Sequence, residues 1–103
     1  MQPNCALITV AAAGSPVQLP AVSGGVEALM IKALASNLGG TVYVGRASNF
    51  NKTSGTDLII DLNGVGEVFS ITTKDANNRI DPVQYWVDAA TSGDKLLVTW
   101  WVR

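Results

Sequence analysis

The first candidates for acid–base or nucleophilic chemistry in this chain are its eight carboxylates and its one thiol. A pair of carboxylates can serve a glycosidase as acid and base, and a thiolate can act as a nucleophile beside a base. The chain contains no histidine, so the usual base for such a nucleophile is missing. The carboxylates fall at expected strand ends and turns, where aspartate commonly stabilises the local backbone; they are Glu27, Asp57, Asp61, Glu67, Asp75, Asp81, Asp88 and Asp94. We therefore expect no catalytic residue and no enzyme.

Metal and phosphate sites lack their characteristic spacing. Asp88 and Asp94 bound a short polar segment, but residues 89–91 between them are Ala-Ala-Thr and do not give the alternating ligands of a calcium loop. The glycines neither open a helix nor precede a Gly-Lys-Ser/Thr sequence, so no phosphate loop is indicated. We expect no metal and no cofactor, and we interpret these segments as turns.

The charge of the chain bears on its partners. The net charge is −1, and the seven lysines and arginines form no run, whereas a nucleic-acid-binding face would show a basic stripe. The longest apolar run is far shorter than the ~20 residues of a membrane span, and no basic region precedes an apolar run at the N-terminus. The expected partners therefore include neither nucleic acid nor membrane, and no targeting segment is expected.

The composition favours a protein that assembles with others. Charged residues make up 15% of the chain, against about 25% in a typical soluble domain, and hydrophobic residues make up 48%. Such a chain should leave apolar surface exposed, and exposed apolar surface often marks an interface. The single cysteine, Cys5, cannot form a disulfide within the chain, and we expect it to fill a core position at the start of a strand.

Short β-prone runs separated by turn residues predict an all-β fold in one domain, residues 1–103. About eight strands joined by short turns favour an antiparallel β-sandwich, a jelly roll in particular, with a β-barrel as the alternative. A polar loop is expected at residues 46–56, as a tip that faces a partner or solvent. The expected strands are residues 5–12, 17–19, 28–34, 41–45, 57–62, 67–72, 84–89 and 95–102.

The last two expected strands carry aromatic side chains without accompanying chemistry: Tyr85, Trp86, Trp100 and Trp101. Neighbouring residues of a strand point to opposite faces of its sheet, so Trp100 and Trp101 cannot both face the core. An outward tryptophan is either shielded by a loop or anchors an interface, because tryptophan and tyrosine are enriched at interface centres. Stacking on a carbohydrate is a third possibility. We take these four residues as interface candidates.

Three stretches, in this order, resemble a group of small tailed-bacteriophage virion proteins over residues 17–102. The first is Ile-Lys-Ala-Leu-Ala-Ser-Asn at 31–37 with Gly-Thr-Val-Tyr-Val-Gly at 40–45. The second is Gly-Thr-Asp-Leu at 55–58 with Gly-Glu-Val-Phe-Ser-Ile at 66–71, and the third is Tyr-Trp-Val-Asp-Ala at 85–89, continuing through Gly-Asp at 93–94 to Val98. The loop at 46–56 and the two-tryptophan ending depart from the pattern.

The resemblance implies a non-enzymatic β-sandwich that decorates or cements the capsid exterior, assembled in the host cytoplasm and located on the virion. It implies two partners, the major capsid protein and further copies of the chain, often in a trimer. Related modules also occur in tails and fibres, where a carbohydrate- or receptor-binding module is the alternative. Such a module would need an exposed aromatic platform ringed by asparagine, aspartate and arginine. A small hydrolase is a third class, which the missing histidine argues against.

Overall fold

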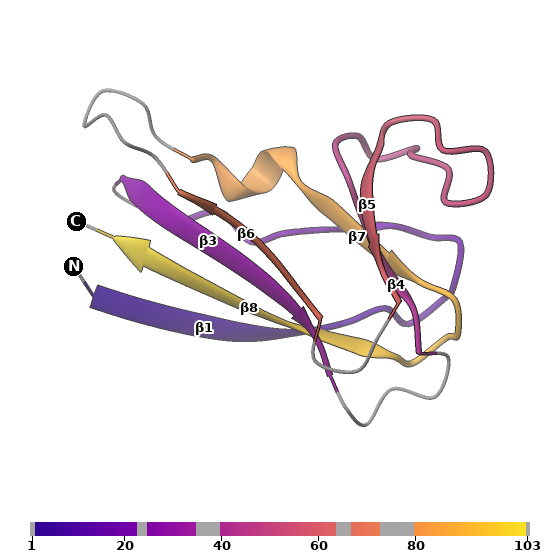
Figure 1. Cartoon of the computed structure of the whole chain (residues 1–103), viewed down its shortest axis with the longest axis horizontal. Coiled ribbons are helices and arrows are strands. Elements are labelled where there is room, and N and C mark those ends of the chain that lie inside the picture. The colour runs from indigo at the N-terminus through magenta and orange to yellow at the C-terminus, as the bar shows by residue number, and fades with distance from the viewer. Residues whose placement is uncertain (1, 23–24, 35–39, 64–66, 73–79, 103) are drawn as a thin grey trace.

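Residues 2–22, 25–34, 40–63, 67–72 and 80–102 are described in a computed structural model of the chain. These residues form eight strands and one short 3-10 turn, so the predicted all-β fold is confirmed (Figure 1). The elements are β1 (Gln2–Thr9), β2 (Val17–Gln18), β3 (Val26–Ala33), β4 (Val42–Gly45), β5 (Leu58–Leu62), β6 (Val68–Thr72), η1 (Pro82–Gln84), β7 (Trp86–Ala89) and β8 (Lys95–Val102).

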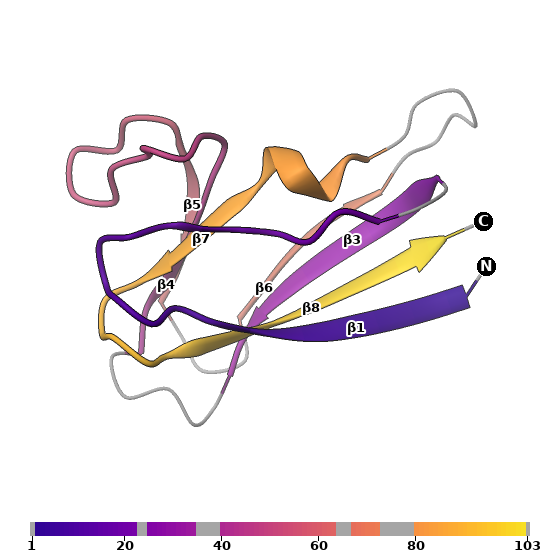
Figure 2. The same cartoon turned by 180° about the vertical axis from the view of Figure 1, so that it is seen from behind.

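The strands pair as the two arms of one long antiparallel hairpin. β1 pairs with β8, β2 with β7, β3 with β6, and β4 with β5 at the tip. Two further antiparallel pairs, β3 with β8 and β4 with β7, gather these strands into two four-stranded sheets. The sheet orders are β1-β8-β3-β6 and β2-β7-β4-β5, which is an antiparallel sandwich and not the closed barrel left open as an alternative. Figures 1 and 2 show both chain ends at the same end of the first sheet.

The core lies between the two sheets, where β3, β4 and β8 bury alternate side chains. In β8, Leu96 and Val98 are buried while their neighbours are partly exposed, and in β4 Val42 and Val44 are fully buried. Burying such a side chain contributes about 1.5–3 kcal/mol relative to leaving it exposed. The buried cluster consists of Val10, Leu19, Leu29, Ile31, Ala33, Val42, Val44, Leu62, Val87, Ala89, Leu96 and Val98.

Cys5 is exposed, so its predicted core position was wrong. The run that starts at Cys5 is apolar at almost every position. Polar and apolar residues therefore do not alternate along it, and the buried face of the strand cannot be read from the sequence. In the structure the even-numbered residues of β1 face the core: Ile8 packs against it, whereas Leu7 is 55% exposed. Because side chains alternate along a strand, Cys5 lies with Leu7 on the solvent side.

The predicted strand at 84–89 begins later than expected, at Trp86. The preceding residues form η1, which starts at Pro82 and is capped by Asp81: its Oδ1 accepts a hydrogen bond from the backbone N–H of Val83 at 3.3 Å. Pro82 has no N–H for a sheet, so the chain turns there before it enters β7.

Residues 35–39, 64–66 and 73–79, which belong to the expected turn segments between strands, lie outside the described residues. In the described part of the chain, no helix is long and apolar enough to cross a membrane.

Candidate functional site

The four interface candidates do not form one cluster. Trp100 and Tyr85 pack against the buried core, and the Tyr85 ring lies 6.4 Å from the ring of Phe69, centroid to centroid. This burial raises the pKa of the Tyr85 hydroxyl above its usual value of 10.0. Trp101 and Trp86 line two different surface grooves. The prediction that Trp100 and Trp101 point in opposite directions is confirmed, and Trp101 is the outward one of the two.

Trp101 lies in a shallow groove on the outside of the β1-β8-β3-β6 sheet. The groove has a volume of about 380 Å³ and is largely apolar. It follows β3 and β6 beside the end of β8, and its lining residues are Glu27, Ala28, Leu29, Met30, Ser70, Ile71, Thr72 and Trp101. An indole in an open apolar groove is the kind of feature that anchors a partner.

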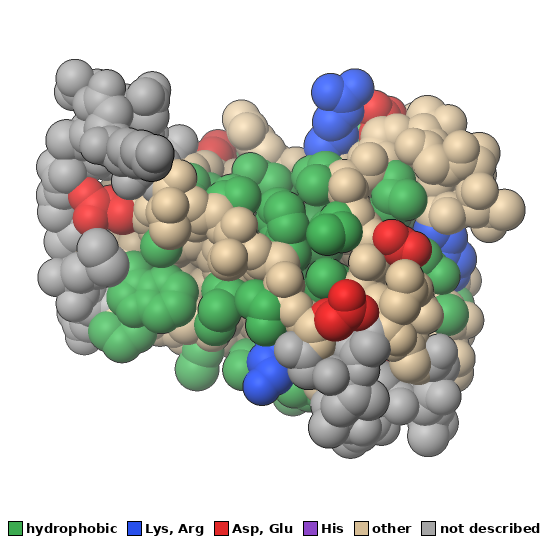
Figure 3. Space-filling model, viewed as in Figure 1, with side chains coloured by type: hydrophobic (Ala, Val, Ile, Leu, Met, Phe, Trp, Pro, Cys, Tyr) green, Lys and Arg blue, Asp and Glu red, His purple; other side chains and the backbone are tan. Residues whose placement is uncertain are grey.

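The groove is part of a larger surface, which we call the apolar outer face. The strand register aligns its residues in rows, such as Pro3, Trp101, Ala28 and Thr72. Its strand rows carry two charged side chains, Lys32 and Lys95, and Glu27 lines the groove at its border. Leu7 and Val68 are 55% and 43% exposed. It comprises Pro3, Cys5, Leu7, Thr9, Ala28, Met30, Lys32, Val68, Ser70, Thr72, Lys95, Leu97, Thr99 and Trp101. Figure 3 shows hydrophobic side chains gathered across the middle of this view, with a few charged side chains around them.

The outside of the second sheet is partly covered by the polar loop at 46–57. Phe50 of this loop is 4% exposed and packs on Gly45 at the end of β4. A Cβ built on Gly45 would lie 2.2 Å from Cγ of Phe50, so only glycine allows the ring to come this close. Glycine within a strand often marks such a close approach. The loop was predicted as a tip facing a partner or solvent; its stem instead rests on its own sheet, while residues 53–56 at its end are exposed.

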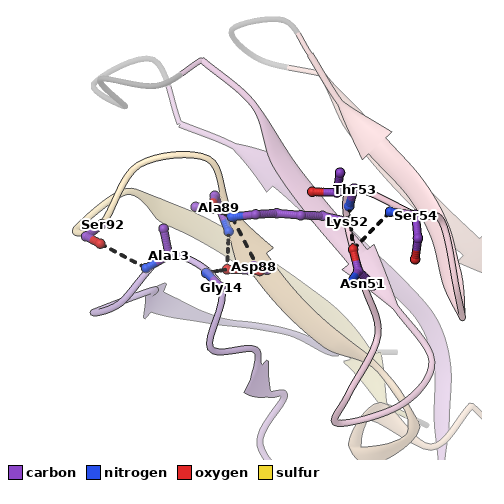
Figure 4. Close-up of polar contacts among 9 residues, drawn as sticks. All are labelled: Ala13, Gly14, Asn51, Lys52, Thr53, Ser54, Asp88, Ala89 and Ser92. Atoms are coloured by element: carbon purple, nitrogen blue, oxygen red, sulfur yellow. Dashed lines mark hydrogen bonds and ion pairs between the residues drawn. The ribbon is translucent and has the colours of Figure 1, made fainter.

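Lys52 connects this loop to β7 through an ion pair and a hydrogen bond (Figure 4). Its Nζ lies 3.6 Å from Oδ2 of Asp88, donates a hydrogen bond to the Ala89 carbonyl, and sits 5.6 Å from the ring centre of Tyr43. Asp88 is 1% exposed, and its Oδ1 accepts from the backbone N–H groups of Gly14 at 3.0 Å and Ala89 at 2.8 Å. A buried carboxylate needs such partners, so Asp88 holds three segments of the chain together.

The base and the turn of the loop are also fixed. Arg46 Nε donates to Oδ1 of Asp57 at 2.9 Å, and the backbone N–H of Arg46 donates to the Asp57 carbonyl at 3.0 Å. Asn51 Oδ1 accepts from the backbone N–H groups of Thr53 and Ser54. The loop is therefore a fixed part of the fold that shields Gly45 and part of β7 from outside contact.

Trp86 lines a second groove, beside Gly45 and the base of the loop at 46–57. Its volume is about 450 Å³, and its lining is half polar. The lining residues are Arg46, Ile59, Val83, Gln84, Tyr85 and Trp86. The Arg46 side chain is 72% exposed, so part of its guanidinium remains accessible despite its pairing with Asp57.

No three histidine, cysteine, aspartate or glutamate side chains of the described residues come together as a metal site. Every buried side-chain nitrogen or oxygen in this part of the chain has a hydrogen-bond partner.

The sequence reasoning missed the contacts of Phe50, Lys52 and Asp88. Two signals were present in the sequence. Gly45 is a glycine within an expected strand, where it often marks a close approach, and Asp88 is an acid between the apolar residues Val87 and Ala89 of another strand. Comparison with protein-family models, with curated proteins and with solved structures finds no match to this chain.

Proposed function

We propose that the chain is a structural protein of a tailed-bacteriophage virion that decorates the capsid exterior. It binds the major capsid protein through the apolar outer face, acts as a small homo-oligomer, and stabilises the head without catalysis. The sequence resemblance implies this role, and the surface chemistry of the described residues is compatible with it.

The strand order supports a jelly roll as the finer description of the fold. A jelly roll is an eight-stranded double sheet built from two Greek keys. Here a long hairpin pairs β1 with β8, β2 with β7, β3 with β6, and β4 with β5. The further pairs of β3 with β8 and of β4 with β7 fit a hairpin rolled up in this way. The same architecture is common in viral capsids.

The observation that carries the proposal is the contrast between the two sheets. On the second sheet, Phe50 and Lys52 of the chain's own loop cover Gly45 and Tyr43, and apolar exposure is confined to Ile59 and Ile60 of the edge strand β5 among the large hydrophobic residues described. On the first sheet, Trp101, Met30 and Leu97 belong to a face that no described segment covers. A large uncovered apolar face on a domain with 15% charged residues is an interaction surface.

The size of this face favours binding in many copies. Four strands at about 4.8 Å spacing and seven residues at about 3.3 Å each give roughly 440 Å². A stable pairwise interface needs about 800 Å² on each partner, so one face alone is too small. At about 25 cal/mol per Å² each contact contributes useful but limited free energy, which becomes strong when linked copies bind a repeating shell.

Capsid occupancy tests the proposal. Heads of the phage that encodes the chain, assembled without it, are mixed with wild-type protein or with Leu97→Lys, and bound protein is measured after sedimentation. Because a buried unpaired ammonium opposes docking, we expect Leu97→Lys to lower occupancy at least tenfold. Thr53→Lys, which adds the same charge at the exposed loop end, is the matched control. Equal occupancy for both variants, or no binding by the wild type, would contradict the proposal.

The Trp86 groove favours a second candidate, a carbohydrate-binding module of a tail or fibre. An indole beside Arg46 and Gln84 combines a stacking surface with hydrogen-bond donors, in a groove large enough for a sugar ring. Glycan-array binding by the wild type that Trp86→Ala abolishes, with no binding to heads, would favour this candidate over capsid decoration. Binding to heads without glycan binding would exclude it.

A further inference from the structure

β1 is an edge strand of an unusual kind. It is eight residues long, it contains no Asp, Glu, Lys or Arg, and in the described part of the chain it pairs on one side only, with β8. Proteins usually protect the edge of a sheet with charges, prolines, bulges or very short strands, and of these β1 has only Pro3, near its start. The other edges follow this rule better: β2 has two residues, β5 carries Asp61, and β6 has five residues.

Two hydrogen bonds show which backbone groups of β1 face outward. The N–H of Val10 donates to the carbonyl of Asp94 at 2.9 Å, in line with the β1–β8 register, so Val10 faces β8. The N–H of Ala33 donates to the Glu67 carbonyl at 3.1 Å, so Ala33 of β3 faces β6. Followed through the register of β3 with β8 and of β8 with β1, this bond also makes the even-numbered residues of β1 face β8. Hydrogen-bonding direction alternates along a strand. The N–H groups of Cys5, Leu7 and Thr9 therefore point to the free edge.

We infer that two copies of the chain pair through this edge, with their β1 strands antiparallel about a two-fold axis at Leu7. This register sets Leu7 against the second copy's Leu7, and Cys5 against its Thr9. All three edge-facing N–H groups then find a carbonyl in the other copy. Pro3, the one edge-facing residue without an N–H, falls outside the paired segment, whereas a register centred on residue 6 or residue 5 would include it.

Charge and side-chain contact fit the same arrangement. β1 itself is uncharged, so its two copies do not repel. Lys95 is level with Thr9, and the two-fold axis places the Lys95 side chains of the two copies roughly 19 Å apart, well beyond the screening length of about 8 Å. Leu7, 55% exposed, gains a leucine neighbour from the other copy.

The pairing also doubles the apolar outer face. Both β1 strands have their exposed side chains on this face, so the two sheets join into one continuous surface of roughly 900 Å². That exceeds the about 800 Å² per partner of a standard interface, which a single copy does not reach. The pairing itself needs only the isolated chain and does not depend on the identity of the larger partner.

Disulfide trapping tests the register. In a hydrogen-bonded antiparallel pair the facing Cα atoms lie about 5.5 Å apart, within the range a disulfide spans. We expect purified Thr9→Cys, treated with oxidised glutathione, to form a covalent dimer through Cys5 of the other copy. Thr9→Cys with Cys5→Ser should remain uncrosslinked, and so should Ser70→Cys, which places a thiol on the same face at β6. Equal crosslinking of Ser70→Cys, or efficient Cys5–Cys5 crosslinking of the wild type, would overturn the register.

Sedimentation of the unmodified chain tests the pairing itself. Leu7→Pro removes an edge-facing N–H and leaves the bonds to β8 in place, so we expect a folded monomer where the wild type forms a dimer. Val68→Pro, the equivalent change on the free side of β6, should keep the wild-type mass. A wild type that is monomeric up to its solubility limit, a trimer of the kind the resemblance implies, or a Leu7→Pro protein with unchanged mass would overturn the inference.

Discussion

Replacing Gly45 with alanine tests whether the packing of Phe50 holds the loop at 46–57 in place. The added Cβ would lie 2.2 Å, 2.3 Å and 2.7 Å from three atoms of the Phe50 ring, against the 3.4 Å or more of ordinary contact. The ring must therefore move by more than 1 Å, and overpacking of this kind costs about 1–3 kcal/mol. Gly45 is not one of the glycines with a positive φ, so its backbone conformation accepts alanine. Without the clash with Phe50, alanine would stabilise the strand by about 0.5–1 kcal/mol.

A double-mutant cycle isolates the contact. Phe50→Ala alone should cost about 3 kcal/mol, because the ring is 4% exposed. Once the ring is gone, Gly45→Ala should cost nothing further, so the double variant should match Phe50→Ala to within about 0.5 kcal/mol or be slightly more stable. The measurement is urea unfolding followed by tryptophan fluorescence. A double variant that loses the sum of the two single costs would refute the proposed contact.

Four further substitutions separate the roles of other side chains, each measured by urea unfolding. Trp100→Ala should lower the unfolding free energy by about 3 kcal/mol because its indole packs on the core, while Trp101→Ala should cost about 1 kcal/mol or less; equal losses would contradict their assignment to opposite faces. Lys52→Met should cost about 1–3 kcal/mol by leaving the buried Asp88 carboxylate without its cation, and a neutral result would show that its backbone donors suffice. Tyr85→Phe should remove part of the alkaline loss of stability: the folded pKa of Tyr85 is raised, so above pH 10.0 the unfolded chain ionises first and stability falls with pH. An identical pH profile for Tyr85→Phe and wild type would contradict that reading.

The sequence predicted the fold well where alternation was visible. Val42 and Val44 alternate with polar or aromatic neighbours, so β4 was found almost to the residue. In β8, Leu96, Leu97 and Val98 follow one another, and the turn residues before Lys95 set its start instead. Alternation also placed Trp100 and Trp101 on opposite faces. It failed at Cys5, because a run of apolar residues has no visible phase, and the phase is set by pairing with β8, almost the whole chain away.

The candidate site was predicted less well, for a physical reason. Tyr85, Trp86, Trp100 and Trp101 are close in the sequence, but β7 and β8 belong to different sheets, so these aromatic residues are divided between the core and two separate grooves. The apolar outer face combines residues from four strands with sequence separations of up to about a hundred positions. Only the strand order brings Pro3, Met30 and Trp101 together, and no local pattern contains that order.

The chain treats its two sheets in opposite ways, and this difference bears on how it assembles. A domain that functioned alone would gain from covering both apolar surfaces, and the loop with Phe50 and Lys52 shows that this sequence can build such a cover. The apolar outer face has no such cover among the described residues, and the free edge of β1 lies at its border without a charge. One copy offers roughly half the area of a stable interface, whereas two copies joined at β1 offer a full one. An uncovered face and an unprotected edge on the same sheet are therefore best explained together, as the surfaces by which copies first join one another and then bind a larger partner.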